Sequence, residues 1–363
     1  MSLYEKPSLS AWEYITLCWA IVRIVFGALA TVLTTPFRFR GDNKAPTLKL
    51  HFLYGVVRAF VENITPRHSQ ALAPSTTEAY EQVAKALGSG FKPAGVKLAD
   101  GTLCCWVGDK SADTVIVWFH GGGYVFSASG ESIEMISNLV SQASKVRKTT
   151  VAALVPEYDL APHATYPRQL QQAATVIRYL TQDLGKSYSH LIVGGDSAGG
   201  NLALGLMSHL SHPHPAIPAL ENVRSLKGVF LISPWVTFKQ GAPAFRTNRY
   251  KDSLSRPALK RWSDLFLRNA PEDEYNSPLS ASEDWWRDVQ AERILVIGGG
   301  DELLVDDIVQ FTEKLQKHNG QKTELVVARG ESHNHMISER RLHIFEEPCE
   351  SEVRLFKWIL DQV

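Results

Sequence analysis

The stretch IVGGDSAGGNLAL, residues 192–204, decides the fold because a strand pattern changes to a helix pattern within a few residues. An apolar run typical of a buried strand ends just before Ser197, and helical spacing begins just after it. Between them lies Gly195-x-Ser197-x-Gly199, a turn so tight that the residues two before and two after the serine nearly touch. The serine is then exposed beside a helix N-terminus, which favours developing negative charge. Ser197 is therefore the predicted nucleophile.

A second glycine-rich stretch, VIVWFHGGGY at 115–124, follows another continuous apolar run that predicts a strand buried on both faces. Glycines have no side chains, so their backbone N–H groups can approach a substrate oxygen closely. We expect Gly122 and Gly123, together with the N–H of Ala198, to form an oxyanion hole. His120 is interpreted as a structural residue that holds this loop and not as a base.

A serine nucleophile needs a base and an acid that orients the base. When the serine lies on a strand-to-helix turn of this kind, the chain order is serine, acid, histidine. The predicted last strand, within 323–333, leads into GESHNH at 330–335. His333 lies in the loop after that strand and is the predicted base. His335 is the alternative, although a surface position suits it better.

The acid should follow the preceding strand, in GGGDELLVDD at 298–307. Asp301 and Glu302 both qualify by position. Asp306 and Asp307 fall one turn later and are expected to cap the helix that follows.

Strand and helix patterns alternate through the rest of the chain. This order predicts an α/β fold with a mostly parallel sheet and helices on both faces. A hairpin is expected at 96–109, turning at Asp100-Gly101. The polar and aromatic stretch 236–290 interrupts the alternation and is expected to form a helical lid with the N-terminal segment. The expected parts are 1–95 as N-terminal helix and lid, 96–235 as first core part, 236–290 as lid insertion and 291–363 as second core part.

These motifs together resemble those of the hormone-sensitive-lipase-like esterases, α/β-hydrolases that include arylacetamide-deacetylase-like enzymes and many fungal esterases. The similarity covers about residue 96 to the C-terminus and includes SPW at 233–235. EYDLAPHATYP at 157–167 resembles the family's Y-R-L-A-P segment, with Asp159 in place of arginine. The resemblance implies an α/β-hydrolase fold with the site roles given above. It also places Glu302 where the family usually has aspartate, which slightly favours Glu302 over Asp301.

The N-terminal segment ITLCWAIVRIVFGALATVL, 15–33, is long and apolar enough to cross a membrane. The central Arg23 would cost roughly 2.5–3.5 kcal/mol on insertion scales. Small and polar residues, Arg23 among them, recur on one helical face. A helix lying in a membrane surface, a single anchor and a helix docked on the protein's own lid are the alternatives. We expect membrane contact through residues 11–35.

Basic residues are more frequent after this apolar segment than before it, which predicts that the catalytic side faces the cytosol. A cleaved signal peptide is less consistent with the sequence, because no clean small-residue cleavage site follows. The expected location is an intracellular membrane, with the endoplasmic reticulum as a candidate.

Composition and motifs also exclude several classes of protein. The 363 residues carry a formal net charge of +0 without a basic run, so no nucleic-acid partner is expected. His209, His212 and His214 lie around prolines without a carboxylate at ligand spacing, and neither a dinucleotide motif nor a P-loop is present. No metal, cofactor or disulfide framework is therefore expected, and the oligomeric state stays open.

The predicted function is a serine carboxylic-ester hydrolase that acts on a hydrophobic ester of small or medium size. An acetyl ester or lactone of a lipid, a sterol or a secondary metabolite would suit such a site. An acyltransferase or a cyclase with the same Ser–His pair is the alternative. A non-catalytic ligand receptor is the remote alternative, since every triad position is filled.

Overall fold

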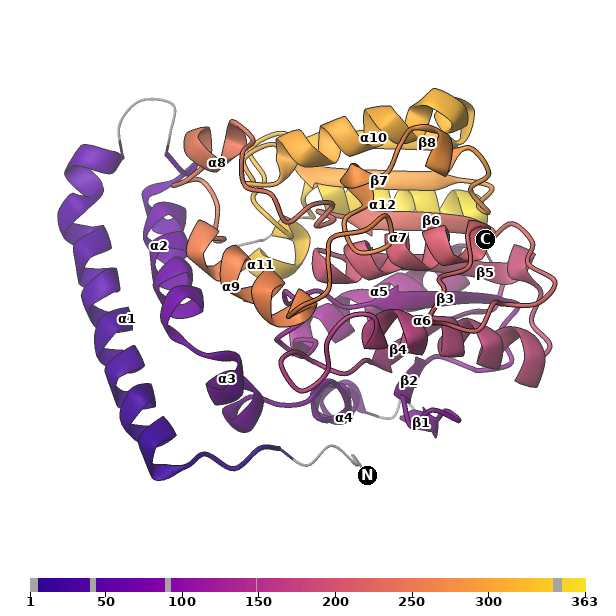
Figure 1. The fold of residues 1–363 in the computed structure, drawn as a ribbon, viewed down its shortest axis with the longest axis horizontal. Coiled ribbons are helices and arrows are strands. Elements are labelled where there is room, and N and C mark those ends of the chain that lie inside the picture. The colour runs from indigo at the N-terminus through magenta and orange to yellow at the C-terminus, as the bar shows by residue number, and fades with distance from the viewer. Residues whose placement is uncertain (1–5, 40–43, 89–92, 148, 342–347) are drawn as a thin grey trace.

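An eight-stranded sheet forms the centre of the molecule (Figure 1). The computed structural model describes residues 6–39, 44–88, 93–147, 149–341 and 348–363. The strands in chain order are β1 (Ala94–Lys97), β2 (Leu103–Val107), β3 (Thr114–Phe119), β4 (Val151–Glu157), β5 (Leu191–Asp196), β6 (Gly228–Ile232), β7 (Ile294–Gly299) and β8 (Thr323–Ala328). In space their order is β1-β2-β4-β3-β5-β6-β7-β8.

Strand direction follows the expectation from the sequence. The predicted hairpin is confirmed, because β1 and β2 pair antiparallel, and β2 also pairs antiparallel with β4. From β4 to β8 all neighbouring strands are parallel. Parallel strands need crossover connections, and helices provide them on both faces of the sheet.

Helices cover the sheet on two sides. On one side lie α5 (Gly130–Arg147), α11 (His335–Arg341) and α12 (Glu350–Gln362). On the other lie α6 (Arg168–Arg178) with its π-helical extension η2 (Tyr179–Asp183), α7 (Ala198–Ser211) and α10 (Val305–Asn319). Short 3-10 turns complete the core at η3 (Tyr188–His190) and η6 (Gly320–Lys322).

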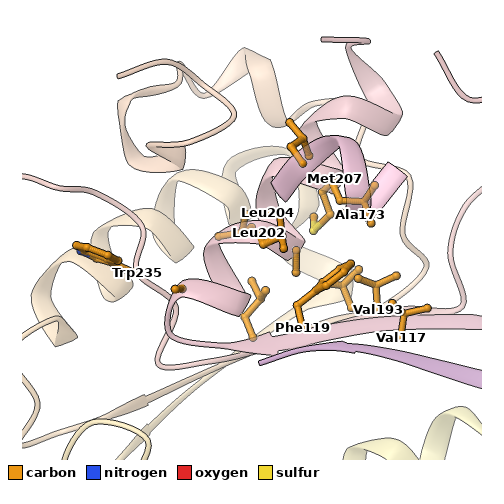
Figure 2. Packing of buried hydrophobic residues seen from close by; sticks show 14 of the residues in the cluster. Val117, Phe119, Ala173, Val193, Leu202, Leu204, Met207 and Trp235 are labelled. Carbon is orange, nitrogen blue, oxygen red and sulfur yellow. The ribbon is translucent and has the colours of Figure 1, made fainter. Parts of the chain in front are cut away.

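Strand β3 shows why the sheet is buried on both faces. Its side chains alternate, with Val115, Val117 and Phe119 in the cluster under α7, and Ile116 and Trp118 in the cluster under α5. All five are fully buried. Figure 2 shows Val117 and Phe119 beneath the α7 side chains Leu202, Leu204 and Met207. This two-sided packing holds the carboxyl ends of the strands, where the site residues lie, in place.

Two segments outside the sheet lie together at one end of the molecule. The N-terminal one contains α1 (Ala11–Arg38), α2 (Leu48–Asn63), α3 (Pro66–Leu72) and α4 (Thr76–Leu87). The insertion 236–290 contains α8 (Ala244–Thr247), α9 (Arg256–Leu267), η4 (Pro278–Ser280) and η5 (Asp284–Trp286). Its α8 and α9 lie at that end, whereas η4 packs on α7 and α10 of the core and η5 packs on α10. Helix α9 lies between α2 and the core in Figure 1 and contacts α2. Its Arg261 donates hydrogen bonds to the carbonyls of Glu62 and Ile64, 2.9 and 3.0 Å away, at the end of α2.

Helix α1 packs on α2 through small residues. A Cβ on Gly27 would lie 2.7 Å from the Cβ of Ala59, and one on Gly55 would lie 2.4 Å from Thr31. Both distances are too short for a side chain, so the two helices meet at their backbones. Gly27 and Thr31 of the small-residue face noted in the sequence therefore dock on the chain's own α2, whereas Arg23 of that face and many large apolar residues of α1 are exposed.

Candidate active site

Ser197 lies at the sharp turn between β5 and α7. Its φ of 53° and ψ of −116° are unusual for a residue with a side chain, and such strain is typical of functional turns. A Cβ on Gly199 would lie 1.9 Å from the carbonyl oxygen of Phe119, and one on Gly195 would lie 2.3 Å from that of Gly199. Neighbouring backbone leaves no room for any other residue, which explains both glycines of the motif.

His333 and Glu302 extend a line of polar contacts from this serine. His333 Nε2 lies 2.9 Å from Ser197 Oγ, and His333 Nδ1 lies 3.0 Å from Glu302 Oε2. The three residues follow three different strands, β5, β7 and β8, whose carboxyl ends meet at one edge of the sheet. Ser197 is 7% exposed, His333 5% and Glu302 0%, so the line is almost completely shielded from solvent.

Burial and pairing shift the pKa values of this pair. Burial opposes the charged form of His333, but the hydrogen bond and charge of Glu302, with the charges of Asp252 and Asp196, outweigh it and raise the imidazole pKa. Burial raises the pKa of Glu302, and the hydrogen bond to His333 partly offsets that rise. The site therefore favours an imidazole that readily holds a proton.

The alternatives named from the sequence lie elsewhere. Asp301, the neighbour of Glu302, forms an ion pair with Lys251 at 3.2 Å. The Nδ1 atom of His335 faces the backbone N–H of Ser332 at 3.4 Å. Of Asp301 and Glu302, it is Glu302 that contacts His333. Of His333 and His335, it is His333 that contacts Ser197.

The expected capping role of two further acids was wrong. Asp306 and Asp307 lie in the first turn of α10, but its N-cap is Leu304, which makes no side-chain capping bond. Asp306 instead accepts a hydrogen bond of 2.7 Å from the backbone N–H of Ala244 in α8. A tertiary contact to the insertion has replaced the local one.

The glycine loop lies directly beside the elbow. Gly122 and Gly123 have φ values of 112° and 60°, and a Cβ on Gly123 would lie 2.5 Å from the ring of Trp262 in α9. Within the described part of the chain, neither of their N–H groups donates to another backbone carbonyl. Ala198 is the first residue of α7, where an N–H has no acceptor within its own helix. These three N–H groups are available to an oxygen of a ligand.

His120 and Asp196 hold the loop and the elbow together. His120 is buried, its ring stacks on that of Tyr158 at 4.3 Å, and burial lowers its pKa to about 4. Asp196 accepts hydrogen bonds from Gly121 N at 2.9 Å and from Asn334 Nδ2 at 2.7 Å. Burial raises the pKa of Asp196 to about 7, because it outweighs these hydrogen bonds, which lower the pKa. The ring of His120 is therefore neutral and lies in the structural position expected for it.

A cavity of about 160 Å³ adjoins these loops. Gly121, Gly122 and Asn334 form part of its wall, and Tyr54 and Val57 of α2 close it from the N-terminal segment. Trp262 of α9 covers the glycine loop from the insertion. Both segments outside the sheet thus contact the loops next to Ser197, α2 at this cavity and α9 at Gly123.

Comparison with known proteins agrees with this architecture. Residues 116–337 match a family model described as alpha/beta hydrolase fold, which is more than half of the chain. The chain belongs to this family. A nucleophile on a strand-to-helix turn is what the alpha/beta hydrolase fold is built to present.

Among curated relatives, the chain is similar to fungal hydrolases. Steryl acetyl hydrolase 1 of Saccharomyces cerevisiae is 27% identical over 54% of this chain and 46% of its own length. The putative steryl acetyl hydrolase mug81 of Schizosaccharomyces pombe is 26% identical over 57% of this chain and 55% of its own. A Gibberella moniliformis protein named esterase is 26% identical over 60% and 66%. The chain thus spans about half to two thirds of the length of these relatives.

Solved structures share the fold. An esterase/lipase from an uncultured bacterium has a TM-score of 0.62 and 23% identity, covering 87% of this chain and 99% of that chain. An esterase from the bacterial hormone-sensitive lipase family has a TM-score of 0.65 and 23% identity, covering 88% and 99%. At this identity the likeness shows the alpha/beta hydrolase fold alone.

Two features of the site had no clear sequence signal. Asp252, in the insertion, accepts hydrogen bonds from the backbone of both the Glu302 loop and the His333 loop. Asn334 reaches Asp196 across the site. Asp196 could have been suspected because it precedes the nucleophile, whereas nothing around Asp252 marks it.

As for metals, the residues that the structure describes include no group of three or more His, Cys, Asp or Glu placed to hold an ion.

Proposed function

We propose that the protein is a serine carboxylic-ester hydrolase in which Ser197 is the nucleophile, His333 the base and Glu302 the acid. The observation that carries the proposal is the line of contacts from Glu302 Oε2 to His333 Nδ1, 3.0 Å, and from His333 Nε2 to Ser197 Oγ, 2.9 Å. These distances are within the range that proton transfer requires.

In the first half of the reaction, Ser197 Oγ bonds to the carbonyl carbon of the ester while His333 Nε2 takes the hydroxyl proton. The carbonyl oxygen becomes an oxyanion, and the N–H groups of Gly122, Gly123 and Ala198 donate hydrogen bonds to it. Each such donor is typically worth about 10²–10³ in rate. Glu302 holds the imidazole in orientation and stabilises its charged form.

The tetrahedral intermediate then collapses. The C–O bond to the alcohol breaks, and the imidazolium of His333 gives its proton to the leaving oxygen. Water attacks the acyl-serine ester, His333 accepts a proton from that water, and the serine leaves with the proton returned to it. The products are an alcohol and a carboxylic acid, and no step calls for a metal or a cofactor.

The proposed substrate is a hydrophobic ester with a small acyl group, such as the acetyl ester of a sterol, another lipid or a secondary metabolite, or a lactone. Two relatives are named steryl acetyl hydrolase and putative steryl acetyl hydrolase, which supports an acetyl group. The cavity of about 160 Å³ beside Gly122 is the place that we assign to the acyl group.

We assign the lid role to the segments 1–95 and 236–290. Ser197 is 7% exposed, and Trp262 of α9 packs against Gly123 above it. Helices α9 and α2 therefore border the approach to Ser197, and they would set specificity.

We also propose that α1 contacts an intracellular membrane, with the endoplasmic reticulum as a candidate. Residues Ala11–Phe37 of α1 form a stretch long and apolar enough to cross one, and little of this stretch is buried in the described structure. Large apolar side chains cover its outer faces: Trp12, Tyr14, Ile15, Trp19, Ile21, Val22, Val25, Phe26, Leu29, Val32, Leu33 and Phe37. Such a surface is larger than a soluble monomer usually exposes, and it suits an apolar environment.

The test is hydrolysis of p-nitrophenyl acetate, butyrate and octanoate and of a steryl acetate, with Ser197→Ala beside the native protein and Ser189→Ala as the control. We expect turnover that is fastest on acetate, is unchanged by Ser189→Ala and falls to background in Ser197→Ala. An organofluorophosphonate that labels Ser197 without any hydrolysis would favour the acyltransferase or cyclase alternative. A folded protein that neither reacts with the phosphonate nor hydrolyses any ester would contradict the proposal and favour a ligand receptor.

A further inference from the structure

Asp252 is a fully buried carboxylate in the insertion, between α8 and α9. Its Oδ2 accepts a hydrogen bond of 2.7 Å from the backbone N–H of Leu303, and its Oδ1 accepts one of 3.3 Å from the backbone N–H of His333. Oδ1 also lies 3.3 Å from the N–H of Leu254, which closes a local turn. A buried carboxylate is costly unless donors satisfy it, and here backbone donors from three segments do so.

Two of these donors belong to the loops that carry the proposed acid and base. Leu303 directly follows Glu302, and the other N–H is that of His333 itself. One side chain therefore joins the loop after β7 to the loop after β8. Asn248, four residues earlier in the insertion, adds bonds from Nδ2 to the carbonyls of Glu302, 2.9 Å, and Gly300, 3.2 Å.

The N-terminal segment reaches the same point. Arg58 of α2 donates a hydrogen bond to the backbone carbonyl of Asp252. Charge-assisted bonds of this kind are stronger than neutral ones and fix the position of their acceptor. A chain of direct contacts thus runs from α2 through Asp252 to the backbone of His333 and the neighbour of Glu302.

We propose that Asp252 is a positioning residue: it holds the Glu302 and His333 loops at the separation that places the imidazole between Glu302 and Ser197, and Arg58 holds Asp252. This inference rests on the proposed hydrolase function. It assigns a role in building the site to the two segments outside the sheet, in addition to covering it. A displacement of about 1 Å in a reacting group can cost on the order of 10²-fold in rate, so a shared anchor for both loops has a measurable consequence.

Loss of the Asp252 charge should change the pH dependence of activity, which loss of a purely structural contact would not do. The acidic groups that act on His333 are Glu302, Asp252 and Asp196, and all three raise its pKa. Removing the charge of Asp252 removes one of these contributions, so the pKa of His333 falls. Because the base must be unprotonated, the acid limb of kcat/KM then moves to lower pH.

The experiment compares Asp252→Asn with the native protein and with Asp264→Asn, which removes an exposed carboxylate of α9 that pairs with Lys260. Phosphonate labelling of Ser197 and the pH dependence of kcat and KM on p-nitrophenyl acetate are measured, with the thermal transition as the check of folding. We expect Asp252→Asn to lower kcat by about 10- to 100-fold with little change in KM and to move the acid limb to lower pH. Asp264→Asn should match the native protein.

Further variants keep the proposal testable if Asp252→Asn does not fold. Asp252→Glu retains the charge but not the geometry, so it should lower kcat while leaving the acid limb in place. Arg58→Gln should lower kcat by itself, and it should add much less loss in the Asp252→Asn background, because both changes act through one contact chain.

The outcomes distinguish a failure of the proposed function from a failure of the role assigned to Asp252. A native protein that is neither labelled nor active contradicts the proposed function. A native protein that is labelled and active, with Asp252→Asn or Asp252→Glu retaining the native kcat and acid limb, overturns the role of Asp252 alone. Independent, additive losses from Arg58→Gln and Asp252→Asn overturn the part assigned to Arg58.

Discussion

The elbow around Ser197 and helix α1 have opposite relations between sequence and environment. At the elbow the residues on both sides of Ser197 are buried, and a Cβ on Gly199 would overlap the carbonyl of Phe119. On α1 the side chains of Trp12, Trp19 and Phe26 are 64–69% exposed, although they are among the most apolar in the chain. The first region is determined by contacts within the fold, whereas the outer faces of the second make few contacts within the described chain.

The same difference distinguishes the residues that we propose to react from the helices that surround them. Ser197 and Glu302 follow the fully buried strands β5 and β7, and His333 follows the partly buried edge strand β8, which pairs with β7 along its whole length. Helix α1 instead packs mainly on α2, away from the sheet, so its outer faces can differ without disturbing the strands. We therefore expect changes in the elbow to abolish folding or activity, and changes in α1 to affect location.

The largest effect should come from Gly199→Ala. The new Cβ would lie 1.9 Å from the carbonyl oxygen of Phe119, and backbone atoms on both sides cannot move apart without breaking β3 from α7. We expect a loss of more than about 4 kcal/mol in the free energy of unfolding, measured by urea denaturation. Gly320→Ala is the matched control, because its φ of −56° suits alanine and no atom lies within 4 Å of the new Cβ. Equal stability of the two variants would contradict the close approach seen at the elbow.

The next largest effect should come from Glu302→Gln. The amide keeps the shape of the side chain but removes the charge that stabilises the imidazolium of His333 and orients its ring. We expect kcat to fall by about 10³–10⁴-fold with the fold intact. Asp301→Asn should cost less than about tenfold, because Asp301 pairs with Lys251. The reverse ranking would show that the neighbouring residue is the acid.

Replacing Trp12, Trp19 and Phe26 by serine together should weaken membrane binding without lowering turnover of p-nitrophenyl acetate. Each side chain contributes about 1.5–3 kcal/mol when fully transferred from water, so the partition coefficient into lipid vesicles should fall by at least about 10²-fold. Val353→Ser on α12 is the control, since Val353 is 51% exposed on a helix of the core. Unchanged vesicle co-sedimentation of the triple variant would remove the membrane role of α1.

The smallest expected effect concerns the native protein and lies in the low-pH side, or acid limb, of its pH profile of kcat/KM. The hydrogen bond and charge of Glu302 raise the pKa of His333 against its burial. Activity should therefore be complete at high pH and should be lost as pH falls through a pKa above the ordinary histidine value of about 6.5. The pH profile of kcat/KM measures this, and a midpoint well below 6.5 would show that burial outweighs Glu302.

Local patterns in the sequence determined much of this protein. Continuous apolar runs predicted the parallel strands, since a strand buried on both faces admits few polar residues. Ser75 and Glu78 form the capping box that begins α4, and their spacing in the sequence is typical of such a helix start. The glycines around Ser197 and after His120 were informative because each turn depends on a few adjacent residues. Family membership in the alpha/beta hydrolase fold followed from these segments.

The tertiary structure alone decided the rest, because it depends on contacts between residues far apart in the chain. Whether Glu302 or Asp301 faces His333 depends on one step along a loop, and the two side chains point to different partners, His333 and Lys251. Asp306 contacts α8 and not its own helix, and Asp252 joins two loops from an insertion without a motif. A hydrogen bond across 81 residues, such as that from His333 N to Asp252, leaves no periodic trace in the sequence.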